Sequence, residues 1–453
     1  MNPTQRLSRL VATARGDLVL PLRPRAAADV VALPLRLADA LDLGASRWVC
    51  VVIDADGGQW TVPVVEGSGE VRRAIAGDGV AAALVTMLAG SGEPASPAFV
   101  MRRWRHPLPD NASKQRKLLS EAGTHERSIA VDQTNDSIVV GERAVVKWAV
   151  RLPADHAVEQ PAARRLGMLA DHGFSGIPAT LGMLQWTGSP PHPALLASVT
   201  EFLPGAVDGW TWAVDDVRAF AAGDVAADTA LLPARQLGVL VAGMHVAFAS
   251  SGRAVADEKT TQRWRDRANH ALDDALRLVD GPEGERLARR APRIRAAFET
   301  FLETSGTPLI DVHGDLHVGQ VLRHGSPSRY ALIDFDGNPV TAIEEGARRQ
   351  PVALDVAGML ASLDHVGRVV IKRTDGVDVD AVLAWIGQAQ ATFFAAYRSA
   401  LLEAGAGALL DDRVIRPLQL EQECREFIYA VRHLPHWRYV PDAALSALLP
   451  DEE

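Results

Sequence analysis

The chain has 453 residues, of which 47% are hydrophobic, so it is long enough for two or three lobes rather than one compact core. Its formal net charge of -9 argues against a nucleic-acid-binding surface. The chain has only two cysteines, which argues against a disulfide framework. Residues 1–15 lack the apolar core of a signal peptide, and the sequence contains no run of about 18 apolar residues that would predict a membrane span. A cytoplasmic location is therefore expected.

Residues 1–100 are predicted to form a small α/β cap subdomain. Two apolar runs, 48–53 and 59–65, flank the turn sequence Asp-Ala-Asp-Gly-Gly, which predicts a β-hairpin. Residues 81–88 suit a short helix, and the Gly, Ser and Pro residues of 90–97 predict a linker. This region shows no catalytic constellation in its sequence.

Residues 101–205 are predicted to form a small β-rich lobe. Runs of β-branched residues indicate strands, and one stretch between them has the apolar spacing of a helix. The predicted strands are 128–131, 137–140, 144–148 and 195–202, and the predicted helix is 158–172.

Residues 206–453 are predicted to form a large α-helical lobe. Helical periodicity is present at 234–249, 258–278, 382–402 and 418–433. Short strands and loops are expected to interrupt these helices at 310–340. A β-rich small lobe followed by an α-rich large lobe predicts an α+β fold with the two-lobed architecture of kinases.

The segments 311–320 and 333–339 contain the candidate catalytic and metal-binding residues. The first contains His-Gly-Asp and then an amide, with Asp315 and Gln320, and the second contains Asp334 and Asp336 in Ile-Asp-Phe-Asp-Gly-Asn-Pro. Phosphoryl transfer needs a carboxylate to hold the acceptor hydroxyl, and oxygen ligands to hold Mg²⁺ on ATP. A turn aspartate after glycine is the structural alternative for Asp315, and an Asp-Gly turn is the alternative for Asp336.

These motifs resemble the catalytic loop and metal motif of aminoglycoside-phosphotransferase-like kinases, and in their fuller form those of actinobacterial maltokinases and glucosamine kinases. The resemblance covers about residue 125 to the end and is weaker over the cap, where it implies a lid or a brace. A purely structural extension is the alternative for the cap. The resemblance implies that Asp315 is the catalytic base, and that Gln320, Asp334 and Asp336 hold Mg²⁺.

The same resemblance implies a nucleotide site in the small lobe. Lys147, at the end of a β-branched run, resembles the strand lysine that contacts the α- and β-phosphates, with Glu159 as its partner. Residues 133–137 occupy the phosphate-loop position without the G-x-G-x-x-G of protein kinases. The remaining predicted ATP contacts are Asn135 and Ser137 in that loop, and Glu201 and Leu203. Residues 200–203 fit the hinge between the two lobes, where backbone groups of Glu201 and Leu203 would pair with adenine.

Lys147, Glu159 and one further residue, Asp355, have ordinary structural alternatives. A lone strand lysine such as Lys147 is usually an exposed edge residue. Glu159 also fits an acid at a helix start, where the helix dipole favours it. Asp355 lies in a segment that resembles the helix after the metal motif in these kinases, which implies that it braces the catalytic loop by hydrogen bonds. It also fits a solvated position on a helix.

The predicted helix 418–433 places Glu423 and Glu426 on one face at i, i+3 spacing. Two such acids repel each other unless a cation or solvent intervenes, and by spacing alone a solvated face is expected. Trp437 follows in a turn, where it either packs or offers a platform for a sugar ring.

This C-terminal pattern resembles the signature of actinobacterial glucosamine kinases. It implies that Glu423 and Glu426 contact the amino sugar, that Trp437 stacks on it, and that the product is glucosamine 6-phosphate. A maltokinase and an aminoglycoside phosphotransferase remain alternatives, as does a non-catalytic nucleotide-binding regulatory module. The expected partners are small molecules only, with no nucleic acid and no membrane, and the protein is expected to be a monomer or homodimer.

Overall fold

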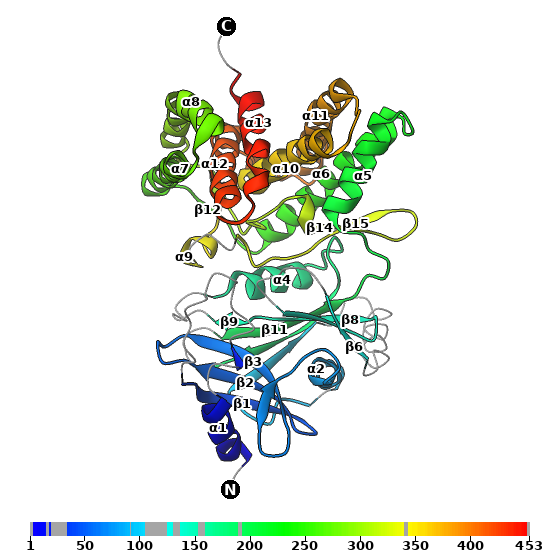
Figure 1. Ribbon diagram of the computed structural model, residues 1–453, viewed down its shortest axis with the longest axis vertical. Helices are drawn as coiled ribbons and strands as arrows, with labels where there is room; N and C mark the ends of the chain where they lie inside the picture. Colours follow the sequence, from blue (N-terminus) through cyan, green and yellow to red (C-terminus); the bar gives the residue numbers. More distant parts are fainter. Residues whose placement is uncertain are drawn as a thin grey trace. The chain divides into compact units, whose positions relative to one another are not determined.

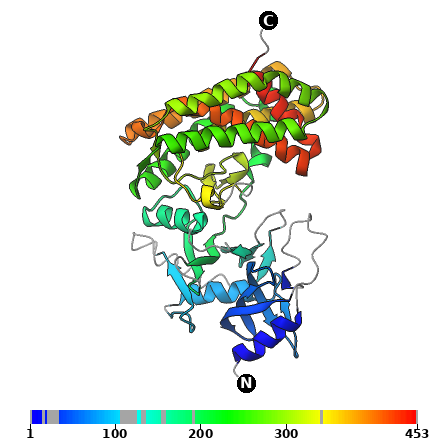
Figure 2. The same cartoon turned by 90° about the vertical axis from the view of Figure 1, so that its left-hand side faces the viewer.

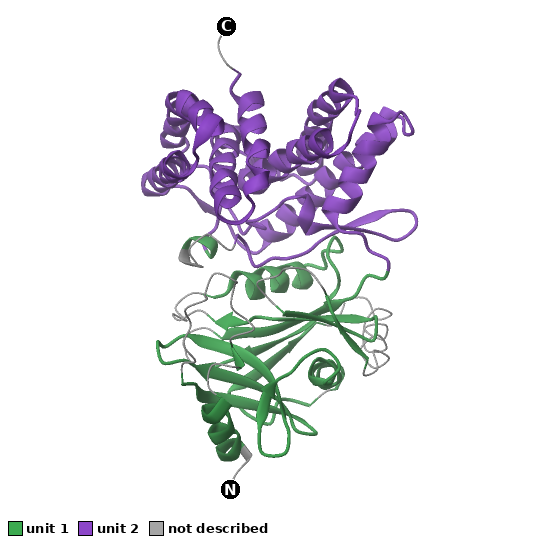
Figure 3. Ribbon diagram, in the orientation of Figure 1, with its two compact units in different colours: residues 1–204, 341–347 green, residues 205–340, 348–453 purple. Residues whose placement is uncertain are grey.

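A computed structural model describes residues 3–14, 18–19, 34–90, 92–104, 125–129, 136–152, 159–188, 193–338 and 343–450 (Figure 1). The chain divides into two compact units: unit 1 comprises 1–204 with 341–347, and unit 2 comprises 205–340 with 348–453 (Figure 3). The division into segments 1–100, 101–205 and 206–453 stays a prediction. The α+β fold class is confirmed, because strands dominate unit 1 and helices dominate unit 2.

The first sheet of unit 1 is antiparallel and contains the predicted hairpin. Its strands are β1 (Arg36–Gly44), β2 (Arg47–Ile53), β3 (Gln59–Glu66) and β4 (Val71–Arg73), with β9 (Arg151–Leu152) also paired to β3. The turn between β2 and β3 is closed by Asp54, whose Oδ1 accepts N–H groups from Asp56 and Gly58. The predicted strands 48–53 and 59–65 are therefore confirmed.

This sheet is buried on both faces. Trp48 and Cys50 of β2 pack in one core with helix α1 (Pro3–Ala14), whereas Val49 and Val51 pack in a second core with helix α2 (Val80–Ala89). The alternation follows from the two-residue period of a strand. Helix α2 confirms the predicted helix at 81–88.

The second sheet of unit 1 is also antiparallel and contains three of the predicted strands. Its order is β5 (Phe99–Arg103), β10 (Thr180–Trp186), β11 (Ala194–Glu201), β8 (Ala144–Trp148), β7 (Asp136–Val140) and β6 (Glu126–Ser128). Its apolar residues share the second core with α2. Helix α4 (Pro161–Asp171) matches the prediction for 158–172 within a few residues, while β5 and β10 were not predicted. The short helix α9 (Ile343–Gly346) also belongs to unit 1.

Unit 2 is a group of helices that lie side by side, with α6 against α11, and α12 against α7 and α10 (Figure 2). The helices are α5 (Gly209–Ala221), α6 (Ala227–Ser250), α7 (Glu258–Leu278), α8 (Gly281–Glu299), α10 (Ala353–Arg373), α11 (Val379–Glu403), α12 (Ile415–His433) and α13 (Tyr439–Leu448). Aspartates cap α5, α7 and α11, where each side chain accepts a backbone N–H of the first turn. All four helices predicted in this region are confirmed.

Short elements interrupt the helices. They are β12 (Ala254–Val255), η3 (Thr300–Glu303), β13 (Pro308–Leu309), η4 (Val318–Gln320), β14 (Val321–His324), β15 (Arg329–Leu332), η5 (Gly407–Leu409), η6 (Asp412–Val414) and η7 (Pro435–Trp437). Those within 310–340, which are η4, β14 and β15, were predicted. Strands β14 and β15 form a hairpin between the two segments that carry the chemical motifs.

Helix α6 is the one helix in the described part of the chain that is long and apolar enough to cross a membrane. Length and composition are the whole of that evidence, and the core helix of a globular unit passes the same test. Here α6 packs lengthwise on α11 and also contacts α5.

Candidate active site

The loop that carries Asp315 follows β13 and leads into η4, and its first half is buried, with Asp311 and His313 2% and 0% exposed. Asp315 itself is half-buried. Its Oδ1 accepts a hydrogen bond of 2.9 Å from Asn338 Nδ2, and its backbone N–H lies 3.4 Å from His313 Nδ1. Asn338 thus holds Oδ1 of Asp315, and the role of Oδ2 as a general base toward an acceptor hydroxyl stays a prediction.

Asp355 of α10 braces this loop from within the core. It is 1% exposed, and its two oxygens accept the backbone N–H groups of His313 at 2.7 Å and Gly314 at 2.8 Å. His245 Nε2 lies 3.0 Å from the same carboxylate, and His245 Nδ1 lies 2.8 Å from the Tyr397 hydroxyl. The bracing contacts predicted from the sequence are confirmed, and the alternative of a solvated helix aspartate is wrong.

The pKa of Asp355 shows which influence dominates. Burial works to raise it, but the hydrogen bond and charge of His245, the nearby His313 and the Gly314 N–H together outweigh burial and lower it. Asp355 therefore remains an acceptor for both backbone groups at neutral pH. The brace needs the carboxylate, since each oxygen is already matched to one N–H.

The candidate metal ligands lie around the open end of the β14–β15 hairpin. Ile333 donates its backbone N–H to the Gln320 carbonyl at 3.0 Å, which extends the hairpin by one pair and brings Asp334 next to η4. The Gln320 amide also lies 3.3 Å from His317 Nε2. Amide and carboxylate oxygens suit Mg²⁺, which usually takes one or two protein carboxylates plus phosphate and water oxygens.

One premise for Asp336 is wrong. The sequence reasoning placed Asp334 and Asp336 on the same side of an extended chain, but Asp334 has a φ of 64°, and the chain turns at residues 335–336. A left-handed residue followed by a turn removes the two-residue alternation of a strand. The role of Asp336 as a metal ligand stays a prediction. Within the described segments, no group of three His, Cys, Asp or Glu side chains is placed to hold a metal ion.

The strand register of unit 1 brings two predicted nucleotide contacts together. Ser137 of β7 lies directly opposite Lys147 of β8, so both side chains project from the same face of the sheet. Asn135 lies outside the described residues. Glu159 is half-buried and precedes α4, and its pairing with Lys147 stays a prediction.

The predicted hinge follows β11. Glu201 donates its backbone N–H to Ala179, and Phe202 donates its backbone N–H to Arg143, so the strand end is anchored on both sides. Leu203 is half-buried one residue further on. The contacts of Glu201 and Leu203 with adenine stay predictions.

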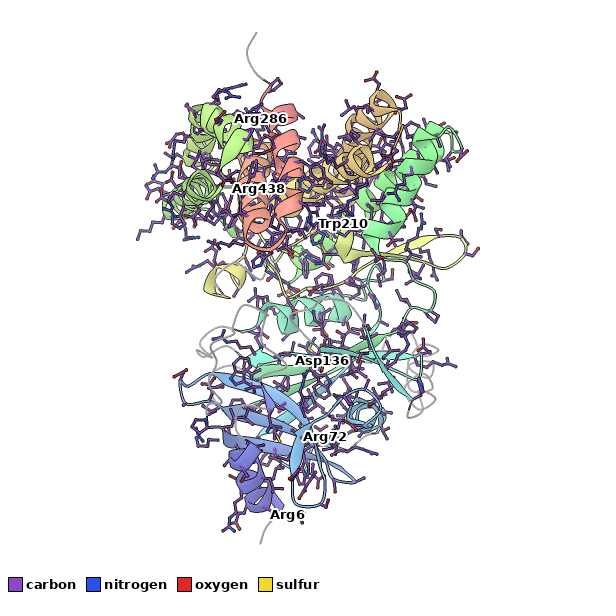
Figure 4. All side chains as sticks on the ribbon, in the orientation of Figure 1. Arg6, Arg72, Asp136, Trp210, Arg286 and Arg438 are labelled. Carbon is purple, nitrogen blue, oxygen red and sulfur yellow. The ribbon has the colours of Figure 1, made fainter. Side chains whose placement is uncertain are left out.

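The cap is tied to the second sheet by charged groups that the sequence analysis did not single out. Glu126 of β6 is 8% exposed, and its carboxylate accepts three backbone N–H groups at the start of α2, those of Gly77, Gly79 and Ala82. Arg73 of β4 donates to Asp136, which is labelled in Figure 4, at 2.6 Å. Asp136 is the last but one residue of the predicted phosphate loop, so the cap holds the end of that loop.

The C-terminal acids are not a solvated face. Glu423 of α12 is 0% exposed, and both of its oxygens lie within hydrogen-bond distance of His365 Nε2, at 3.0 and 3.1 Å. Glu426 accepts from Gln422 Nε2 at 3.0 Å and from Trp437 Nε1 at 3.3 Å. Periodicity located this helix face, but only packing against α10 shows that Glu423 is buried.

Trp437 is 9% exposed and lies within an aromatic cluster rather than on an open turn. Its ring makes edge contacts with Trp210 at 5.6 Å and His365 at 6.3 Å between ring centroids. The indole N–H of Trp437 donates a hydrogen bond to Glu426, so the polar contact that the structure shows for Trp437 is with this acid. Stacking of Trp437 on a sugar stays a prediction.

Two connections within unit 2 join the C-terminal acids to the catalytic loop. Trp210, labelled in Figure 4, lies on the first turn of α5 and packs on Trp437. Trp210 also lies against Gly319, where an added β-carbon would be only 3.0 Å from Nε1 of Trp210. Ser362 of α10 accepts the backbone N–H of Val318 at 2.9 Å, one helical turn before His365. Sequence reasoning missed these residues because a single Trp, Ser or His in a helix carries no pattern.

His365 and Glu423 form a pair in which the surrounding carboxylates favour the protonated form of the histidine. Burial disfavours imidazolium, but the carboxylates of Glu423, Glu426 and Asp364 outweigh it and raise the pKa of His365 to about 9. Burial raises the pKa of Glu423 to about 7, while His365 works in the opposite direction. A cation, His365, therefore lies beside Glu423, where a solvated face was expected from the spacing alone.

Comparison with known proteins places the whole chain. No family model matches it. It is 51% identical to a glucosamine kinase of Streptacidiphilus jiangxiensis over 449 residues, which is 99% of each chain, and 40% identical to a glucosamine kinase of Mycolicibacterium smegmatis over 421 residues, which is 91% of this chain and 98% of that relative.

A solved structure of glucosamine kinase in complex with glucosamine, ADP and inorganic phosphate superposes with a TM-score of 0.84 at 50% identity, covering 98% of this chain and 99% of that one. A second crystal form of glucosamine kinase gives a TM-score of 0.86 at 49% identity, with the same coverage. The predicted kinase fold is confirmed by these full-length matches. The chain therefore belongs to the glucosamine kinase family.

Proposed function

We propose that this chain transfers the γ-phosphoryl group of ATP to glucosamine and forms glucosamine 6-phosphate. The observation that carries the proposal is the match along 99% of the chain to a glucosamine kinase at 51% identity. The buried, braced loop around Asp315 and the acid Glu426, both in unit 2, supply the chemistry that such a reaction needs.

Asp315 is the proposed base. Its Oδ2 accepts the hydrogen bond of the sugar 6-hydroxyl while Asn338 holds Oδ1, so the hydroxyl oxygen is aimed before the reaction. That oxygen forms the new bond to phosphorus, the bond from phosphorus to the β-phosphate oxygen breaks, and the hydroxyl proton passes to Asp315 late in the step. A positioned base of this kind contributes about 10²–10⁴-fold.

The remaining roles concern charge. Gln320, Asp334 and Asp336 are the proposed ligands of Mg²⁺, which when bound offsets the negative charge of the transferred phosphoryl group. In unit 1 the proposed ATP contacts are Lys147, Glu159, Asn135, Ser137, Glu201 and Leu203. Glucosamine is an ammonium ion at neutral pH, and Glu426 is the proposed acid that favours it over neutral sugars.

The setting proposed for the enzyme is the cytoplasm, with small-molecule partners only, as a monomer or homodimer. Cys50 and Cys424 are both free and buried, and burial raises the pKa of both thiols, which keeps them protonated and unreactive. Two inert thiols fit a reducing compartment.

The test is ADP release from ATP and Mg²⁺ with glucosamine, maltose, glucose, N-acetylglucosamine and kanamycin offered separately. Turnover on glucosamine that is lost in Asp315→Asn is expected. Turnover on maltose or kanamycin instead would retain the catalytic residues and overturn the proposed acceptor. Nucleotide binding without turnover on any acceptor would point to a regulatory module and refute the proposed activity.

A further inference from the structure

We propose that His365 and Glu423 form a buried charge pair that positions Glu426 for the ammonium group of the acceptor, so that Glu423 acts through His365 instead of touching the sugar. This inference rests on the proposed function, because it concerns the amino-sugar site of the same reaction. It assigns His365 of α10 and Glu423 of α12 as positioning residues.

The geometry of the pair closes Glu423 off from a ligand. Glu423 is 0% exposed and His365 is 4% exposed. His365 Nε2 lies 3.0 Å from one Glu423 oxygen and 3.1 Å from the other, so both oxygens face the imidazole. A sugar could reach this carboxylate only if α12 separated from α10. His365 and Glu423 are therefore placed to hold the neighbouring residues of the site in position, without contacting the sugar.

Unlike Glu423, which faces a charged partner, Glu426 is bonded to neutral groups. Its two oxygens accept from neutral donors, the Gln422 amide and the Trp437 indole. Arg425 donates to the Gln422 oxygen at 2.7 Å, and among the described residues no cation forms an ion pair with Glu426. A half-buried carboxylate oriented by two neutral hydrogen bonds keeps its charge for a cationic partner, and a protonated amine supplies one.

The aromatic cluster transmits the position of the pair to Glu426. The His365 ring stands edge-on to Trp437, with centroids 6.3 Å apart and planes at 87°. Trp437 in turn donates its N–H to Glu426. If His365 moves, the indole that orients Glu426 loses its lateral support.

The pair also removes a repulsion. Glu423 and Glu426 lie at i, i+3 on α12, where like charges destabilise each other. A protonated His365 balances Glu423, whereas Glu426 has no ion-pair partner among the residues that the structure describes. The other charges nearby, Asp364 and Arg368 of α10, pair with each other at 3.0 Å.

A matched control lies two residues away. Glu421 is on the same helix, is 2% exposed, and pairs with Arg267 of α7 at 2.7 Å. It forms a buried ion pair like Glu423, but among the residues that the structure describes no aromatic contact links its partner to Glu426. Glu421→Gln therefore reports the cost of breaking a buried pair on α12, without the positioning role.

The experiment compares His365→Gln, Glu423→Gln, the double variant and Glu421→Gln. The quantities are kcat, KM for glucosamine and KM for ATP, with thermal unfolding to verify the fold. Each single change at the pair is expected to raise KM for glucosamine about tenfold, equivalent to about 1.4 kcal/mol, with KM for ATP unchanged. The double variant should recover most of this loss, since two facing amides form a hydrogen bond and leave no unpaired buried charge.

A second readout does not depend on turnover. In protein labelled with ¹⁵N-tryptophan, Trp437→Phe identifies the indole N–H resonance of Trp437 among the 10 tryptophans. This resonance is expected to shift in His365→Gln and to stay in place in Glu421→Gln. It remains measurable in any variant that folds, even one without activity.

The outcomes separate the two proposals. A wild-type enzyme without turnover on glucosamine would overturn the proposed function. Wild-type turnover with an unchanged KM for glucosamine in both single variants, or an equal rise in Glu421→Gln, would overturn the positioning role alone. Additive losses in the double variant would also refute it, because they would show that the two residues act separately.

Discussion

The amide of Asn338 donates a hydrogen bond of 2.9 Å to Oδ1 of Asp315 and so joins two motifs that lie 23 residues apart in the chain. The bond fixes the rotation of the carboxylate and leaves Oδ2 for the acceptor. Asn338 sits two residues beyond Asp336, so the segment that carries the candidate metal ligands also orients the proposed base.

Removal of this bond should slow the chemical step. Asn338→Ala is expected to lower kcat about 10- to 100-fold, within the range expected for misplacing a reacting group, with little change in KM for ATP. Asn338→Asp should be worse, because a second carboxylate 2.9 Å away repels Asp315. Steady-state kinetics measure both. Asn269→Ala, a change on α7, serves as the control, and wild-type kcat in Asn338→Ala would show that Asp315 is oriented without this bond.

The brace beneath the catalytic loop should matter for both stability and rate. Asp355→Asn replaces one accepting oxygen by an NH₂ group, so one backbone N–H of the loop loses its partner at a cost of about 1–3 kcal/mol. Urea unfolding should show this loss, and kcat should fall with it. Tyr397→Phe removes only the outer hydrogen bond to His245, at about 1 kcal/mol. An equal effect of the two changes would contradict the brace.

The His365–Glu423 pair predicts how stability depends on pH. The folded pKa of His365 is about 9, above its ordinary 6.5, so its contribution is full below about pH 6.5 and is lost as pH rises through about 9. The folded pKa of Glu423 is about 7, above its ordinary 4.5, so the folded state again holds more protons and stability again falls as pH rises.

Urea unfolding between about pH 5 and 9 checks this sign. The wild type should lose stability across that interval relative to the variant in which both residues are glutamine. Parallel curves for the two proteins would mean that neither residue has a shifted pKa in the folded state.

In unit 1, Glu126 should be a stability determinant of the cap. Glu126→Gln replaces a carboxylate that accepts three backbone N–H groups, so at least one of them loses its acceptor, at about 1–3 kcal/mol. Glu142→Gln is the control, since that residue pairs with Arg127 at the surface, where solvent screens the ion pair and its loss should change stability little. Thermal unfolding compares them, and amide hydrogen exchange at 77–82 locates the change. Equal losses would show that Glu126 does not hold the start of α2.

The sequence by itself determined the features that depend on neighbouring residues. The repeat of apolar residues located α7 at 258–278 to the residue, and the Asp-Gly turn located the β2–β3 hairpin. The spacing of Asp315, Gln320 and Asp334 indicated phosphoryl transfer, because a catalytic loop and the hairpin after it are continuous in the chain.

Only the tertiary structure decided which distant side chains meet. Periodicity placed Glu423 and Glu426 on one face of α12 but could not tell that α10 covers Glu423, because the covering residue, His365, lies 58 residues earlier in the chain. The left-handed backbone at Asp334 likewise broke the alternation expected of an extended chain. Burial and charge pairing depend on what packs against an element, and that information lies outside the local sequence.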